Sequence, residues 1–169
     1  GLVIKMGLSG IGISGTEARA EAGVFSVAYA RAVAAQGLTG VEWMATLPGT
    51  IGGAVYGNAG AFGSETKDHI RAVEVIDHNG NEKTLSPDAC EFSYRNSIFK
   101  KQKGAFAVLA ATFLLTKGDP AEINARMNQF LAKRKDEQPL GASSAGCMFK
   151  NHIDKDGKRV AAGWLIEQA

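Results

Sequence analysis

The sequence predicts an α+β fold from two kinds of periodicity. Residues 71–77 alternate apolar and polar side chains, and the turn pair Asn79-Gly80 leads into a return strand over 82–85, which is the pattern of a β-hairpin. Residues 26–37 and 119–135 instead repeat apolar side chains at helical spacing. With 169 residues, the chain is long enough for one ordinary domain, or for a small domain with part of another.

In the first third we expect short strands and two helices. Residues 2–6 read as a strand, and the glycine-rich segment 8–15 reads as a turn between short strands. Ser26 is the expected cap of an amphipathic helix that ends at Gly37. A second, short helix is expected over residues 41–47, and Pro48 ends it.

Beyond the hairpin, Pro87 is placed to open a helical turn, and residues 105–116 form an apolar, β-branched stretch typical of a buried strand. Asp119-Pro120 begins the longest predicted helix, which ends at Gln138-Pro139. The last third is expected to hold a strand at Met148-Phe149, a turn over 154–157 and a helix over 160–166.

Composition excludes several classes of protein. Hydrophobic residues make up 45% of the chain and charged residues 21%, values typical of a globular protein. A formal charge of +2 argues against nucleic-acid binding, and no apolar stretch approaches the roughly 20 residues that span a bilayer. The default expectation is therefore a cytoplasmic protein without membrane or nucleic-acid partners. The three histidines share no ligand spacing, so no metal site is expected, and Cys90 and Cys147 form no disulfide framework.

The chain ends suggest a piece of a longer protein. Residue 1 is Gly, the following residues read as a strand already under way, and the last residues stop inside a predicted helix.

Residues 47–63 are the most unusual stretch, with six glycines and three alanines among seventeen residues. One interpretation is a mobile linker, but linkers are usually polar, whereas this stretch carries Ile51, Val55, Tyr56 and Phe62. The favoured interpretation is a cradle that offers backbone amides to a phosphate.

Two side chains are candidates for chemistry. Arg95, between Tyr94 and Asn96, could hold a carboxylate with two hydrogen bonds, and the alternative is a surface salt bridge. Cys147 could donate a proton, since thiols release protons far more readily than hydroxyls, and the alternative is a small buried hydrophobe. Cys90 is assigned to the core. No nucleophile elbow or P-loop lysine appears.

Four motifs, in order along the chain, resemble the UDP-N-acetylenolpyruvoylglucosamine reductase family. They are Gly40-Val41-Glu42-Trp43 with Leu47-Pro48-Gly49-Thr50-Ile51-Gly52-Gly53-Ala54 and Asn58-Ala59-Gly60-Ala61; Tyr94-Arg95-Asn96-Ser97-Ile98-Phe99; Ser144-Ala145-Gly146-Cys147-Met148-Phe149-Lys150-Asn151; and Gly163-Trp164-Leu165-Ile166-Glu167-Gln168-Ala169. The resemblance covers nearly the whole chain.

This resemblance implies a flavoenzyme. Residues 1–118 would be the second half of a two-part FAD-binding domain of the vanillyl-alcohol-oxidase (PCMH-like) type, and residues 119–169 the start of an α/β substrate-binding domain. NADPH would reduce FAD, which then reduces an enolpyruvyl sugar nucleotide in peptidoglycan precursor synthesis. Arg95 would stabilise the enolate and Cys147 would supply the proton, with Tyr94, Lys150 and Asn151 as substrate contacts. The residues implied to face FAD are Pro48, Gly49, Thr50, Ile51, Gly52, Gly53, Ala54, Asn58 and Gly60.

The family pattern also sets limits. Its first flavin subdomain would precede Gly1, and its C-terminal catalytic glutamate would follow Ala169, a role that Glu167 does not take. His152 stands where the family usually has proline. We therefore expect the 169-residue chain by itself to bind FAD weakly or not at all and to be inactive. The alternatives are another flavin oxidoreductase of the same FAD-binding fold, or a non-catalytic sugar-nucleotide-binding module.

Overall fold

The chain forms two compact units, residues 1–137 and 138–169, in a computed structural model that describes residues 1, 5–138 and 147–169. Three predictions fall wholly or partly outside this description: most of the strand over 2–6, Pro139 at the end of the long helix, and Ser144-Ala145-Gly146 of the third motif. Within the described part of the chain, no helix has both the length and the apolar character needed to cross a bilayer.

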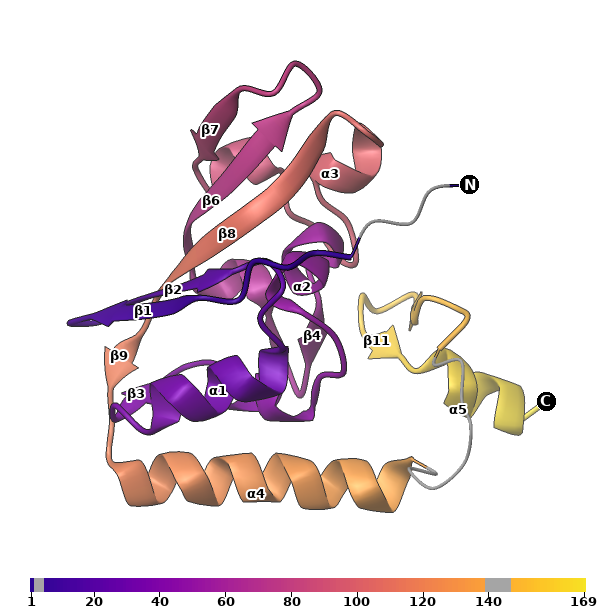
Figure 1. Cartoon of the computed structure of the whole chain (residues 1–169). Coiled ribbons are helices and arrows are strands. Elements are labelled where there is room, and N and C mark those ends of the chain that lie inside the picture. Colours follow the sequence, from indigo (N-terminus) through magenta and orange to yellow (C-terminus); the bar gives the residue numbers. More distant parts are fainter. Residues whose placement is uncertain (2–4, 139–146) are drawn as a thin grey trace. The chain divides into compact units, whose positions relative to one another are not determined.

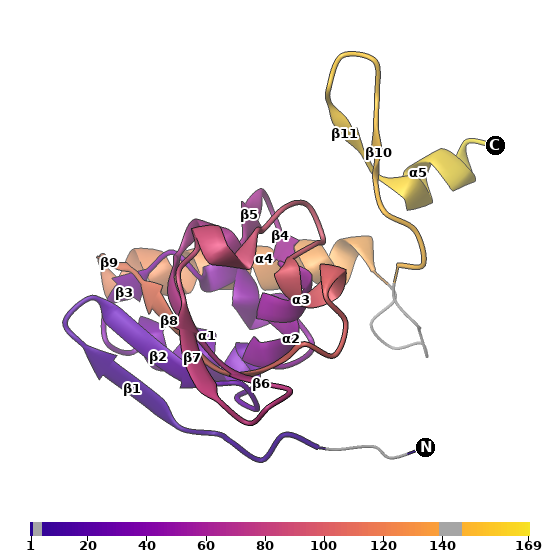
Figure 2. The same cartoon turned by 90° about the horizontal axis from the view of Figure 1, so that it is seen from above.

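The first unit is built on a five-stranded antiparallel sheet with the order β1-β2-β8-β6-β7 (Figures 1 and 2). The strands are β1 Ile11–Ser14, β2 Glu17–Glu21, β6 Ile70–Asp77, β7 Glu82–Leu85 and β8 Phe106–Leu114. The predicted hairpin over 71–85 and the predicted strand over 105–116 are thus confirmed. The β1–β2 hairpin was missed: residues 11–14, predicted as part of a turn, form a strand, and the turn lies at Gly15 and Thr16.

Helices cover one side of the first unit. They are α1 Ser26–Ala34, the 3₁₀ helix η1 Glu42–Thr46, α2 Ile51–Gly57, the 3₁₀ helices η2 Thr66–Asp68 and η3 Asp88–Cys90, α3 Ile98–Lys101 and α4 Pro120–Glu137. Short strand pairs join β3 Leu38–Thr39 to β9 Thr116–Lys117, and β4 Gly60–Ala61 to β5 Ser64–Glu65. Helix α2 packs against β8 (Figure 1). Helices α1 and α4 both pack against η1.

Large buried side chains join these layers. Tyr29 of α1 packs against Phe113 of β8 with ring centroids 5.0 Å apart and ring planes tilted by 40°, and its hydroxyl donates to the carbonyl of Ala18 in β2. Trp43 and Met44 of η1 are also buried. Burial of each such side chain stabilises the fold by roughly 1.5–3 kcal/mol. Ser26 does not cap α1 as predicted, because the helix begins at this residue and its hydroxyl is buried without a partner among the described residues.

Helix α4 is held against the rest of the first unit by several contacts. Phe130 stacks on Phe62 at a centroid separation of 4.6 Å, and Arg126 lies 3.5 Å from the buried carboxylate of Glu42. The predicted apolar face is confirmed for Ile123 and Met127, which are buried. The compact unit thus ends after α4, whereas the predicted boundary between flavin and substrate domains, after residue 118, remains a prediction about function.

The second unit contains β10 His152–Ile153 paired with β11 Arg159–Val160, followed by α5 Ala162–Glu167. The predicted turn over 154–157 and the following helix are confirmed, while the predicted strand at Met148-Phe149 begins instead at His152. Met148, Phe149 and Trp164 are exposed.

Candidate functional site

The glycine-rich stretch is a helix with a tight entry turn rather than an open loop. Helix α2 begins after Thr50, whose side chain accepts from the Gly53 amide at 3.4 Å. Ile51 and Val55 point into the core and are fully buried, as expected for residues that hold this stretch in place. Their burial compensates for the low helix propensity of a seven-residue segment with three glycines.

The amides at the start of α2 are mostly used inside the protein. Ile51 donates to the carbonyl of Val24 at 2.8 Å, Gly52 donates to the carbonyl of Ala22 at 2.9 Å, and Ala54 donates to Thr50. These amides are therefore not free to bind a phosphate in the way that the sequence suggested. Among the described residues, none accepts from the amides of Gly49 and Thr50, which remain available at the turn.

A shallow pocket lies beside this turn, with a volume of about 280 Å³. Helix α2 contributes Thr50, Gly52, Gly53 and Tyr56, and the facing wall is formed by Met6, Ala22, Phe106, Ala107 and Val108. Tyr56 was not predicted, although its place three residues after Gly53 puts it on the same helix face.

The glycines of α2 have different roles. A Cβ on Gly52 would lie 2.9 Å from the Cβ of Ala22, so this glycine is required where the helix meets the residue that follows β2. A Cβ on Gly53 would meet only the Thr50 hydroxyl, at 3.7 Å, and would otherwise extend into open space. No internal contact requires Gly53, and its bare backbone faces the pocket.

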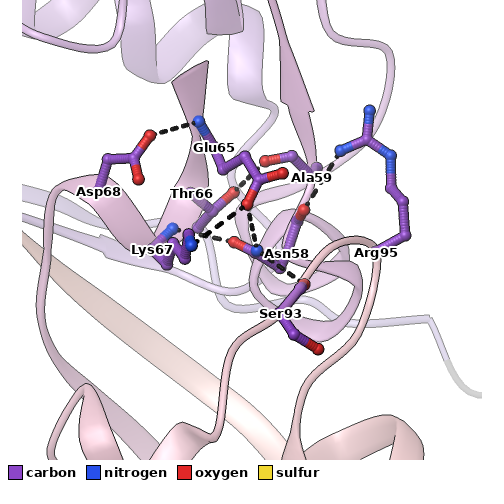
Figure 3. A network of polar contacts seen from close by, with 8 residues as sticks. All are labelled: Asn58, Ala59, Glu65, Thr66, Lys67, Asp68, Ser93 and Arg95. Carbon is purple, nitrogen blue, oxygen red and sulfur yellow. Dashed lines mark hydrogen bonds and ion pairs between the residues drawn. The ribbon is translucent and has the colours of Figure 1, made fainter. Parts of the chain in front are cut away.

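Arg95 is held at the other end of the same helix. Its guanidinium donates to the carbonyl of Asn58, just beyond the last turn of α2 (Figure 3). It also donates to the carbonyl of Gly60 and lies 5.2 Å from the ring centroid of Tyr94. Arg95 has a φ of 53°, in the left-handed region, at the tip of the turn closed by Ser93 and Asn96. The Arg95 guanidinium binds main-chain carbonyls and makes no carboxylate ion pair among the described residues, so the surface salt bridge considered from sequence is not what the structure shows.

Asn58 and Gly60 are explained by internal packing. Asn58 is completely buried, has a φ of 43° and forms the C-cap of α2. A Cβ on Gly60 would overlap the carbonyl of Ser64 at 2.4 Å, so the β4–β5 pair requires glycine there. Contact of these two residues with a cofactor remains a prediction.

Cys147 lies in the second unit and is exposed. It lines a pocket with Met148, Phe149, Asn151, Ala162, Gly163 and Ile166. The Asn151 side chain accepts from the Ala162 amide at 3.4 Å, at the start of α5, and Lys150 is exposed. Cys90, in contrast, is fully buried, and burial raises the pKa of its thiol to about 11. The structure thus assigns Cys90 to the core, as predicted, and shows that Cys147 is not the small buried hydrophobe considered from sequence.

Comparison with known proteins defines the class. The family model described as an FAD binding domain matches residues 1–86, just over half of the chain. The chain therefore belongs to the FAD binding domain family, which confirms both the predicted fold class and FAD as the cofactor.

The individual proteins most informative about this chain are UDP-N-acetylenolpyruvoylglucosamine reductases. That of Caldanaerobacter subterraneus subsp. tengcongensis is 41% identical over all of this chain and 54% of its own length. That of Anoxybacillus flavithermus is 36% identical, over all of this chain and 55% of its own. The crystal structure of the Thermus caldophilus reductase superimposes with a TM-score of 0.74 at 33% identity, covering 89% of this chain and 52% of that one. The chain thus spans about half the length of the relatives it matches.

Proposed function

We propose that the whole protein reduces the enolpyruvyl ether of UDP-N-acetylglucosamine to UDP-N-acetylmuramate, with FAD as hydride carrier and NADPH as reductant, in cytoplasmic peptidoglycan precursor synthesis. One observation supports this best: a single helix joins both functional parts of the first unit. The start of α2 lines the pocket, and the carbonyls just beyond its end hold Arg95. Seven helical residues span only about 10 Å, so a cation lies near the pocket.

The pocket fits part of an FAD molecule. The Thr50 amide, from which no described residue accepts, suits a phosphate at the pocket, and the Gly49 amide is available at the exposed turn beside it. The bare backbone of Gly53 permits close approach, and the exposed ring of Tyr56 offers an aromatic face. Pro48 is exposed at the same turn, whereas Ile51 and Ala54 are buried behind it and would act by holding the turn in place. Bound FAD supplies the hydride.

The protein's own side chains handle the charge and the proton. When hydride adds to C3 of the enol ether, negative charge develops on C2 and the adjoining carboxylate, and the Arg95 guanidinium would stabilise it. Cys147 would then protonate C2, completing a two-electron reduction of the carbon–carbon double bond, and water would return a proton to the thiolate. We propose Tyr94, Lys150 and Asn151 as substrate contacts.

Gly52 and Gly53 provide a matched test of the cofactor pocket. Gly53→Ala is expected to lower the flavin content of the purified whole protein, because the new methyl group enters the pocket, while stability stays unchanged or rises by about 1 kcal/mol through better helix propensity. Gly52→Ala should instead destabilise the fold by about 1–3 kcal/mol, because its methyl group is forced against Ala22. Flavin absorbance and thermal unfolding measure the two effects. A Gly53→Ala protein with full flavin content would place FAD elsewhere.

The reaction itself is tested by following the flavin spectrum in two steps. The whole protein should show an oxidised flavin spectrum, lose it on anaerobic addition of NADPH, and regain it when the enolpyruvyl sugar nucleotide is added. A flavin that NADPH reduces but the sugar nucleotide does not reoxidise would point to another flavin oxidoreductase. A protein that binds the sugar nucleotide without any flavin would be the non-catalytic module.

A further inference from the structure

Asn58 lies at the centre of the polar contacts between α2, β5 and the turn that carries Arg95 (Figure 3). Its side-chain amide donates to Glu65 Oε2 at 2.9 Å and to the carbonyl of Ser93 at 3.0 Å, and its Oδ1 accepts from the Lys67 amide at 3.0 Å. Both N–H donors and the oxygen are therefore engaged inside the protein. Since this side chain is also completely buried, its polar groups serve contacts within the protein.

Asn58 is both a donor and an acceptor of hydrogen bonds with the turn that carries Arg95. Its side chain donates to Ser93, whose main chain closes the turn with Asn96 through two hydrogen bonds of 3.1 and 3.0 Å. In return, Arg95 at the tip of this turn donates to the main-chain carbonyl of Asn58. The left-handed conformation of Asn58 aims that carbonyl at the guanidinium while the side chain reaches the base of the turn.

Other contacts hold the same turn less directly. Lys100 Nζ donates to the carbonyl of Arg95 at 3.0 Å, and Ser97 Oγ donates to the carbonyl of Tyr56 at 2.7 Å. Lys100 thus holds the carbonyl at the tip of the turn and Ser97 fixes the main chain after it, whereas Asn58 contacts both the base of the turn and the Arg95 guanidinium. Loss of the Asn58 side chain should therefore loosen the guanidinium without releasing the whole loop.

We propose that Asn58 is a positioning residue for Arg95, which it fixes in the orientation that the proposed reduction requires. This inference rests on the proposed function for its catalytic consequence, but the positioning itself does not depend on it. An error in placement of the order of 1 Å can slow a reaction by as much as about 10²-fold.

Asn58→Gly is the most direct variant, because glycine keeps the left-handed backbone and removes only the side chain. In the whole protein we expect reoxidation of reduced flavin by the enolpyruvyl substrate to slow about tenfold, with reduction by NADPH unchanged. In an Arg95→Ala background, the same substitution should add less than about a twofold effect, because coupled residues are not additive. An equal slowing in both backgrounds would contradict the proposal.

Asn81→Gly is the matched control. Asn81 is also a turn asparagine with side-chain hydrogen bonds, to Asp77 at 3.3 Å, but it lies in the β6–β7 hairpin and is not among the residues described in contact with Arg95. The Asn81→Gly variant should keep the rates of both flavin steps within about twofold of those of the unmodified protein, while its stability is lowered. A similar slowing by Asn81→Gly would mean that general loosening, rather than positioning, explains the effect.

A measurement independent of activity separates this inference from the proposed function. The Nε–Hε signal of Arg95, in protein labelled with ¹⁵N-arginine and assigned with Arg95→Lys, should shift or broaden in Asn58→Gly but not in Asn81→Gly. If Asn58→Gly does not fold, Asn58→Asp combined with Glu65→Gln serves, since aspartate tolerates the same backbone and removes the donor to Ser93, while glutamine removes the facing carboxylate. An unchanged Arg95 signal would overturn the positioning role even if the reductase activity is present, and a changed signal would support it even if that activity is absent.

Discussion

Replacing Cys147 with alanine is expected to slow reoxidation of the reduced flavin by the enolpyruvyl substrate by about 10²–10⁴-fold, the usual effect of losing a general acid. Reduction by NADPH should be unchanged, because that step needs no proton at C2 of the sugar substrate. The exposed thiol lines a pocket of its own unit, so it is accessible for such a transfer. Stopped-flow absorbance of the whole protein measures the two steps separately.

Two further variants control this prediction. Cys147→Ser should keep much more activity than Cys147→Ala, since a hydroxyl can also donate a proton, although less readily than a thiol. Cys90→Ala removes the other thiol, which is fully buried and held in its neutral form by a raised pKa. It should lower stability and leave both flavin steps unchanged. Unchanged reoxidation in Cys147→Ala would exclude this thiol as the proton donor.

The hairpin over β6 and β7 could be predicted from sequence because local signals agree there. Val73 and Val75 alternate with polar residues, and the Asn79-Gly80 pair suits the tight turn. Asp77 adds support that sequence does not show: its buried carboxylate accepts from the amides of Asn79 and Asn81. The ion pair with Lys83 and these hydrogen bonds hold the pKa of Asp77 well below its usual range.

The β1–β2 hairpin was missed because the inward side chains of β2 are small. Ala18 and Ala20 are completely buried in β2, but alanine is not enriched in strands, so the alternation with charged residues carries little signal. Pairing with β8 forms this strand, and such a long-range contact cannot be inferred from local sequence.

The glycine-rich stretch shows why composition predicts a site only in part. The stretch indicated by the sequence does line a pocket and precedes the carbonyls that hold Arg95, while its contact with FAD remains a prediction. The sequence could not separate the glycines by role. Gly52 and Gly60 are required by internal packing, whereas Gly53 lines the pocket although no described packing contact requires a glycine there. The role of Asn58 was equally hidden, because its partners come from residues 65, 67 and 93.

Arg95→Ala should reduce the rate of flavin reoxidation by the sugar nucleotide by about 10²–10³-fold, comparable to the loss of a preorganised group that stabilises developing negative charge. Reduction by NADPH should again be unaffected. Two of the guanidinium's N–H groups are engaged with the carbonyls of Asn58 and Gly60, and the others remain to bind a carboxylate or enolate oxygen. This arrangement fixes the charge before substrate arrives, so little reorganisation is needed during the reaction.

Arg95→Lys and Arg19→Ala test whether the rate of flavin reoxidation depends on the fixed position of the Arg95 cation or only on its charge. Lysine keeps the charge, but its compact ammonium on a flexible stem does not reproduce the planar fork of the guanidinium, so Arg95→Lys should recover only a small part of the lost rate. Arg19 forms a two-point ion pair with Glu74, at 2.6 and 2.7 Å, on the sheet and away from the Arg95 turn. Arg19→Ala should therefore weaken the fold without changing either flavin step. If Arg95→Lys matched the unmodified protein, charge alone would be sufficient, and the fixed geometry that Asn58 provides would have no catalytic purpose.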